Sequence, residues 1–100
     1  MIELTGKQRR YLRSLSNRLK ATVHVGKEGI TDGLLASLED EFAHRELVKL
    51  HVNPNCDYSA RELGHMLPQE AGAAWVQTIG HSVVLYRPFE EPEIGLPGPS

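Results

Sequence analysis

The sequence predicts an α/β fold, a two-layer sandwich in which three helices pack on a mixed four-stranded sheet. Two capping boxes, at Thr5–Gln8 and Ser59–Glu62, each mark the start of a helix. Short β-branched segments alternate with segments of helical periodicity, so the first strands need crossover connections. The last two strand-like segments are joined tightly at Gly80-His81, which indicates an antiparallel hairpin. The expected order is helix, strand, helix, strand, helix, strand, strand.

The first half of the chain contains the first three of these elements. The first helix begins after Thr5, and leucines at helical spacing form its expected buried stripe: Leu12, Leu15 and Leu19. Residues 22–25 are short and β-branched, as in a strand. Thr31 is the expected N-cap of the second helix, whose apolar side consists of Leu35, Leu38 and Phe42, with Ile30 and Leu35 forming a hydrophobic staple.

The second half contains the other four elements. Residues 46–53 alternate as a strand with Val48, Leu50 and Val52 on one face and Leu47, Lys49 and His51 on the other. The third helix begins after Ser59, and Pro68 is expected to kink or end it. Residues 73–80 and 82–87 are the hairpin strands. We expect a single domain over residues 1–88, followed by an irregular, acidic, Pro- and Gly-rich tail over residues 89–100.

Composition is that of a globular protein, with 40% hydrophobic and 24% charged residues. No apolar run approaches the ~20 residues of a membrane span, so no membrane partner is expected. The N-terminus lacks the apolar core of a secretory signal. The single cysteine, Cys56, cannot form an internal disulfide, which fits a reducing compartment. The expected location is the cytoplasm, and the expected state is a monomer.

The charge distribution is asymmetric although the formal net charge is −2. Residues 1–20 carry six basic side chains and one carboxylate, a local charge of +5. At ~100° per residue, Arg9, Arg10 and Arg13 share an arc of the first helix that faces away from its leucines. Such an arc is either a phosphate-binding face or merely a solvated helix surface, and charge pattern alone leaves both readings open.

The segment Gly26-Lys27-Glu28-Gly29 links the first strand to the second helix. Unpaired amides and the helix dipole favour an anion at such a helix start. Glycine lets the backbone approach a ligand closely because no Cβ stands in the way. This is the physical logic of the GxxG loop that clamps the RNA backbone in KH domains.

The chain also resembles the CRM-domain family (chloroplast RNA splicing and ribosome maturation), in particular its stand-alone bacterial YhbY-like members. The most specific matching pieces are "VGKEGIT", which contains the GxxG, and "QTIGHSVVLYRP". The resemblance implies an RNA-binding domain with a fold like the C-terminal domain of a bacterial translation initiation factor. It also implies ribosomal RNA, or precursors of the 50S subunit, as the partner. The sequence departs from the family at Glu28, which places a carboxylate in the loop, and at His81, where lysine is common.

The expected RNA-contacting residues lie in the loop, in the first helix and after the last strand: Gly26, Lys27, Glu28, Gly29, Lys7, Arg9, Arg10, Arg13 and Arg87. No cofactor, metal or catalytic residue is expected, because the five histidines and Cys56 show no metal-ligand or nucleophile spacing. The alternative is a protein-interaction module that uses the acidic side of the second helix and makes no RNA contact.

Overall fold

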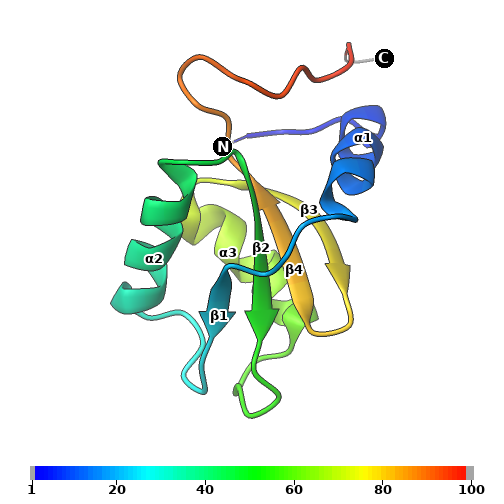
Figure 1. The fold of residues 1–100 in the computed structure, drawn as a ribbon. Coiled ribbons are helices and arrows are strands. Elements are labelled where there is room, and N and C mark those ends of the chain that lie inside the picture. The colour runs from blue at the N-terminus through cyan, green and yellow to red at the C-terminus, as the bar shows by residue number, and fades with distance from the viewer. Residues whose placement is uncertain (1, 99–100) are drawn as a thin grey trace.

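The computed structural model describes residues 2–98, which form three helices and four strands (Figure 1). The helices are α1 (Gly6–Ser16), α2 (Asp32–Phe42) and α3 (Ala60–Ala71), and the strands are β1 (Val23–Val25), β2 (Leu47–Val52), β3 (Ala74–Ile79) and β4 (Ser82–Tyr86). Thr5, Thr31 and Ser59 cap the three helices, and both predicted capping boxes are present. The predicted α/β class and the order of the elements are therefore confirmed.

The sheet is mixed, with the strand order β1-β2-β4-β3. β1 pairs with β2 in parallel, while β4 pairs antiparallel with both β2 and β3. Gly80 adopts a φ of 55° in the two-residue turn between β3 and β4, a conformation that glycine accepts without steric cost. Because β1 and β2 are parallel, the loops that come after them leave from the same end of the sheet.

β2, one of the two inner strands, packs on both of its faces. Val48, Leu50 and Val52 join the main core, which α2 and α3 cover. Leu47 faces the other way and joins a second cluster with Leu12 of α1 and with β3 and β4 residues. The sheet and the α2/α3 pair form two layers, and α1 crosses the opposite face at one end of the sheet (Figure 1).

The buried side of α1 differs from the predicted stripe of leucines. Leu12 is fully buried, but Leu15 is 37% exposed and the second buried position is Ser16. The helix ends at Ser16, so Leu19 lies beyond it and packs only partly against the second cluster. The reason lies in β3, where Gln77 donates a hydrogen bond of 2.7 Å to the Ser16 hydroxyl. That bond satisfies a buried polar group, which sequence periodicity alone cannot anticipate.

Two further details differ from expectation. In α2 the residue that occupies the core is Leu34, together with Leu38 and Phe42, while Leu35 is only partly buried. In α3 the helix does not end at Pro68 but continues to Ala71. Leu67 and Ala71 are both buried on the sheet side, and this packing holds the turn after the proline in helical form.

A buried carboxylate holds the segment after β4 against the domain. Glu46 is only 3% exposed, and its side chain accepts hydrogen bonds from the backbone N–H groups of Phe89, Glu93 and Ile94 at 2.7–2.9 Å. Ile94 and Leu96 then pack against the second cluster. The segment is irregular, as expected, but its described part is fixed in place by these contacts.

Arg87, directly after β4, joins α2 to the sheet. Its guanidinium forms two hydrogen bonds of 2.7 and 2.8 Å with the Glu39 carboxylate, and its carbon lies 4.7 Å from the centroid of the Phe42 ring. These hydrogen bonds lower the pKa of Glu39 below its ordinary value of 4.5 and raise the pKa of Arg87. The pair is partly exposed, so its contribution is that of a surface ion pair with good geometry.

The anchoring role of Glu46 predicts the effect of Glu46→Gln. The amide keeps the shape but directs an NH₂ group at backbone donors, so unfolding should cost about 1–3 kcal/mol less. Urea denaturation measures this loss, and amide exchange at Phe89, Glu93 and Ile94 should become faster. The exposed Glu90→Gln is the control and should change neither quantity. An unchanged midpoint for Glu46→Gln would show that the carboxylate does not hold the segment.

The Arg87–Glu39 pair predicts a pH-dependent effect for Glu39→Gln. Because the folded-state pKa of Glu39 lies below the unfolded value, the pair stabilises the fold above about pH 4.5, and this is lost as pH falls through the lower pKa. The variant should lose ~0.2–1 kcal/mol of stability at neutral pH and progressively less in acid. Urea denaturation of wild type and Glu39→Gln from neutral pH into acid measures this difference in stability. If the two proteins differ in unfolding free energy by the same amount at every pH, the contact is not ionic.

Candidate nucleic-acid interface

The GxxG loop continues from β1 into a tight turn that neighbouring chain supports. The Gly29 N–H donates to the Gly26 carbonyl at 3.1 Å, which closes the turn. The segment after β2 braces it, because the Asp57 N–H donates to the Lys27 carbonyl at 2.9 Å and the Asn53 N–H donates to the Val25 carbonyl at 3.0 Å. The loop is thus held by backbone bonds on the side toward β2.

The two glycines of the loop have different roles. Gly29 is buried, has a φ of 75°, and would place a Cβ only 2.7 Å from the Tyr58 ring, so a side chain there would distort the turn. Gly26 is exposed, has no positive φ, and would place a Cβ in open space with nothing within 4 Å. The fold therefore requires glycine at position 29, while nothing in the packing requires it at position 26.

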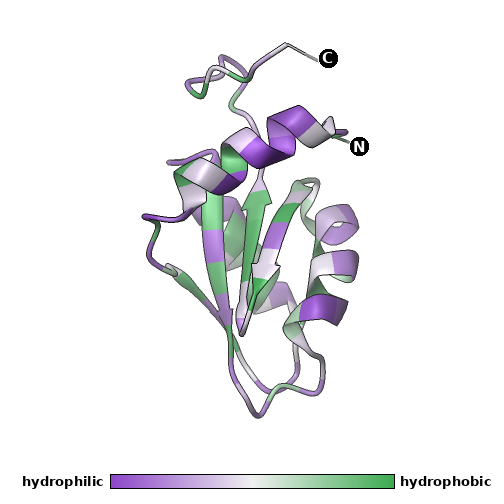
Figure 2. Ribbon diagram, turned by 90° about the vertical axis from the view of Figure 1, so that its right-hand side faces the viewer, coloured by the Kyte–Doolittle hydropathy of each residue, from purple (hydrophilic) through white to green (hydrophobic). Residues whose placement is uncertain are grey.

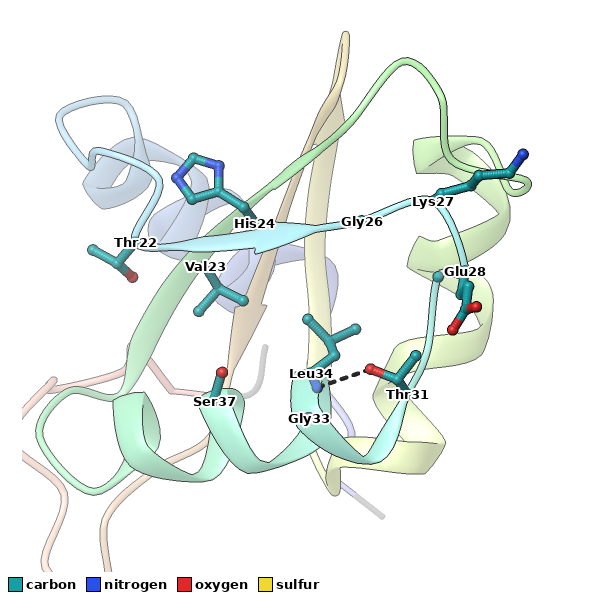
Figure 3. Close-up of a pocket in the computed structure, with 11 residues that line it drawn as sticks. Thr22, Val23, His24, Gly26, Lys27, Glu28, Thr31, Gly33, Leu34 and Ser37 are labelled. Carbon is teal, nitrogen blue, oxygen red and sulfur yellow. Dashed lines mark hydrogen bonds between the residues drawn. The ribbon is translucent and has the colours of Figure 1, made fainter.

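The loop borders a cavity of about 590 Å³ between β1 and the start of α2 (Figure 3). Thr31 and Gly33 line it from the first turn of α2, where the helix dipole favours an anion. The Thr31 hydroxyl already accepts the Leu34 N–H at 3.1 Å. Lys27 extends outward from the loop, while Glu28 turns to the side on which Thr31 lies (Figure 3). The cation is thus presented to the surroundings and the carboxylate lies closer to the helix start.

Side chains around the loop carry more negative than positive charge. Lys27 is accompanied by Glu28, and Asp32 occupies the first turn of α2. Attraction for a phosphate at this end must therefore come mainly from backbone N–H groups and the helix dipole, as at other helix starts that bind anions. The open backbone at Gly26 is the part of the loop to which such a ligand has access.

The arginines of α1 lie at the other end of the sheet (Figure 1). α1 packs over Leu47 at the start of β2, whereas the loop comes after Val25, which pairs with Val52 at the end of β2. Six strand residues span ~20 Å, so the structure does not bring the loop and the arginines together. Arg9 is turned toward β3, with its guanidinium carbon 5.5 Å from the centroid of the Trp75 ring.

The remaining basic residues of α1 face outward. Lys7, Arg10 and Arg13 are exposed, and within residues 2–98 none of them forms a salt bridge. Figure 2 shows α1 as a largely hydrophilic helix across one end of the green strands. Arg87 lies neither at the GxxG loop nor among the basic residues of α1. Its guanidinium donates to the Glu39 carboxylate and to the Ala71 carbonyl, on the α2/α3 side of the sheet.

Two features near the loop were not predicted from the sequence. Tyr58 is 38% exposed and packs beside Gly29. His24, His51 and His81 form a row along the sheet, with ring centroids 5.9 and 6.3 Å apart. Strand register makes this row, since His24 pairs with His51 and His51 with Ser82, and spacing along the chain carries no signal of it. Among residues 2–98 no three His, Cys, Asp or Glu side chains are grouped so that they could hold a metal ion.

The length and polarity of the helices bear on membrane association. In the part of the chain that the structure describes, no helix has the length and apolar character needed to cross a bilayer.

Comparison with known proteins assigns the chain to a family. Residues 4–87 match the sequence profile of the CRS1/YhbY (CRM) domain. The chain is 42% identical over 98 residues to an "RNA-binding protein" of Haemophilus influenzae, covering 97% of this chain and 98% of that one. It is 37% identical over 88 residues to "Probable RNA-binding protein YqeI" of Bacillus subtilis, covering 88% and 92% of the two chains.

A solved structure agrees with this result. The solution structure of the hypothetical protein SAV1595 from Staphylococcus aureus superimposes with a TM-score of 0.81 at 40% identity, and the match covers 95% of this chain and all of that one. The two relatives above are named for RNA binding and not for a catalytic activity, in agreement with the expectation that the chain is no enzyme. The profile match, the identities and the shared fold together show that this chain belongs to the CRS1/YhbY (CRM) domain family.

Proposed function

We propose that this protein binds structured RNA through its sugar-phosphate backbone, with the GxxG loop as the principal clamp. The observation that carries the proposal is the open backbone at Gly26, beside the amino end of α2, at a position where packing does not require glycine. A phosphate can approach N–H groups there without meeting a Cβ. The RNA-binding names of relatives with 42% and 37% identity support the same function.

The exposed basic residues of α1 are the second contact in this proposal. Lys7, Arg10 and Arg13 face solvent ~20 Å from the loop, so they would bind a different phosphate run from the one that the loop clamps. Contacts of this kind fix position and orientation on an RNA but do not read its sequence. Arg9 and Arg87 are expected to contribute less, because each is already in contact with other parts of the protein.

The proposed target is ribosomal RNA in precursors of the large ribosomal subunit, bound in the cytoplasm by a monomer of this chain. The YhbY-like resemblance supports this target. Cross-linking in cells followed by sequencing of the bound RNA identifies it directly.

The alternative function, a protein-interaction module on the acidic side of α2, has weaker support. Two carboxylates of that helix have cationic partners, since Glu39 pairs with Arg87 at 2.7 Å and Glu41 with Arg45 at 3.6 Å. Partial neutralisation lowers the charge that a basic partner would recognise. The acidic side of α2 is thus used in part within the domain itself.

Gly26→Ala tests the clamp because the fold has room for the new Cβ. The variant should keep or slightly raise its melting temperature, since alanine has less conformational freedom in the unfolded chain. RNA affinity should fall at least about tenfold if the phosphate lies against the backbone, equivalent to ~1.4 kcal/mol. Thermal melts and titration with a structured ribosomal RNA fragment measure both quantities.

The matched control for this substitution is Gly95→Ala. Gly95 also has open space around it but lies outside the loop. Gly95→Ala should likewise keep or slightly raise the melting temperature, and it should leave RNA affinity unchanged. Equal RNA affinity for wild type and a folded Gly26→Ala variant would end the clamp proposal.

The double variant Arg10→Gln/Arg13→Gln tests the second contact. Each lost phosphate contact should flatten the plot of log affinity against log salt by ~0.7–0.9 units, so the pair should reduce its slope by roughly one to two. Arg45→Gln is the control, because Arg45 is paired with Glu41 on α2. A slope equal to that of wild type would place the RNA away from α1.

A further inference from the structure

A second cavity, which the proposed clamp does not use, lies between α3 and the edge strand β3. Its volume is about 400 Å³. Four residues on one side of α3 line it, together with two from β3: Arg61, Gly64, His65, Pro68, Trp75 and Thr78. Volumes of this order suit a small organic group or one unit of a polymer.

The indole of Trp75 forms an exposed aromatic wall in this cavity. The side chain is 37% exposed although tryptophan is large and apolar, and its Nε1–H donates to the Thr78 hydroxyl at 2.9 Å. The polar group of the indole is thus satisfied inside the protein, and the part of the ring that lines the cavity remains for a ligand. Gly64 allows α3 to pack close to the indole, since a Cβ at Gly64 would come within 3.1 Å of the Trp75 Nε1 atom.

The polar side chains at the cavity favour an anionic ligand, with Arg61 as the fixed positive charge. Arg61 and His65 are exposed on α3, one turn apart, and both line the cavity. The guanidinium carbon of Arg9 also lies over the indole, 5.5 Å from the ring centroid, but Arg9 does not line the cavity. Among the described residues that do line it, none carries a carboxylate. An aromatic wall with a basic margin is the arrangement that binds a nucleobase by stacking and its phosphate by charge.

The position of the cavity links it to the clamp. Arg61 also lines a neighbouring groove that contains Tyr58 and His81, and Tyr58 packs against Gly29 of the GxxG loop. The groove and the cavity share Arg61 and Thr78, so a strand of RNA that leaves the loop past Tyr58 would reach Trp75. This inference rests on the proposed RNA-binding function and adds to it a subsite for one base.

We propose that the cavity between α3 and β3 binds one unpaired nucleobase of the RNA, stacked on Trp75, with Arg61 and His65 toward its phosphate. A double-stranded segment cannot supply this base, because its bases are stacked on one another and paired. The domain would then prefer a structured RNA that continues into a single strand over a fully paired one.

The single tryptophan of the chain gives a direct readout. The full protein is titrated with an RNA hairpin that carries an unpaired adenosine tail and with the same hairpin without the tail. Anisotropy of the labelled RNA reports binding, and Trp75 emission reports stacking. We expect both RNAs to bind, the tailed one more tightly, and only the tailed one to quench Trp75 along its binding curve.

Variants separate stacking from folding. Trp75→Leu should weaken binding of the tailed hairpin ~5- to 150-fold and leave the untailed one unchanged. Trp75→Phe also lacks the Nε1 bond to Thr78 but keeps an aromatic face, so it should retain most of the affinity. Ile79→Ala is the control, because Ile79 is 59% exposed on the same strand and does not line the cavity.

The outcomes distinguish this inference from the function on which it rests. Binding of both hairpins without tail-specific quenching, or with equal affinity for wild type and Trp75→Leu, would overturn the base subsite and leave RNA binding in place. Failure of the folded protein to bind either hairpin would overturn the proposed function. Quenching by an acidic aromatic peptide but not by RNA would make the cavity a protein-docking site and overturn the inference as well.

Discussion

The two-sided burial of β2 is the constraint on which the rest of the structure depends. Alternate side chains of one strand enter two separate clusters, so β2 fixes α2 and α3 on one face and α1 on the other. A shift of its register by one residue would exchange the two sets. Both ends of the strand also anchor other segments. Glu46 precedes it and holds the chain after β4, while Val52 ends it beside the strand that leads into the GxxG loop.

The shape of the GxxG loop depends on the segment that comes after β2. Parallel pairing sends the chain after β1 and the chain after β2 out at the same end of the sheet. There the Asp57 N–H donates to the Lys27 carbonyl, and Tyr58 packs against Gly29. Packing thereby requires glycine at position 29, whereas Gly26 stays open, and this opening is what the proposed clamp would use. A rigid turn of this kind loses little conformational entropy on binding, which favours a phosphate clamp made of backbone donors.

Charged residues serve structure as well as binding in this domain. Arg87 and Glu46 are charged, yet their contacts join distant segments of the chain. Arg9 stands beside Trp75 and so belongs to the surface around β3 more than to the outer side of α1. Net charge and local charge sums are therefore poor guides to which cations can meet RNA. Which basic residues of α1 are exposed, and that the loop has no excess of positive side chains around it, are visible only once each charged residue is placed in the fold.

The sequence by itself determined the class, the order of elements, the three caps and the GxxG loop, because caps, periodicity and glycine act over a few residues. It did not determine which side of α1 is buried, since Ser16 depends on Gln77, 61 residues away in sequence. Nor did it show that α3 continues through Pro68, or that three histidines align across the sheet. Tertiary structure also decided that the GxxG loop and the arginines of α1 lie at opposite ends of the sheet, and that Trp75 and Arg61 line the same cavity. These are matters of register and packing between distant segments, and local sequence patterns carry no information about them.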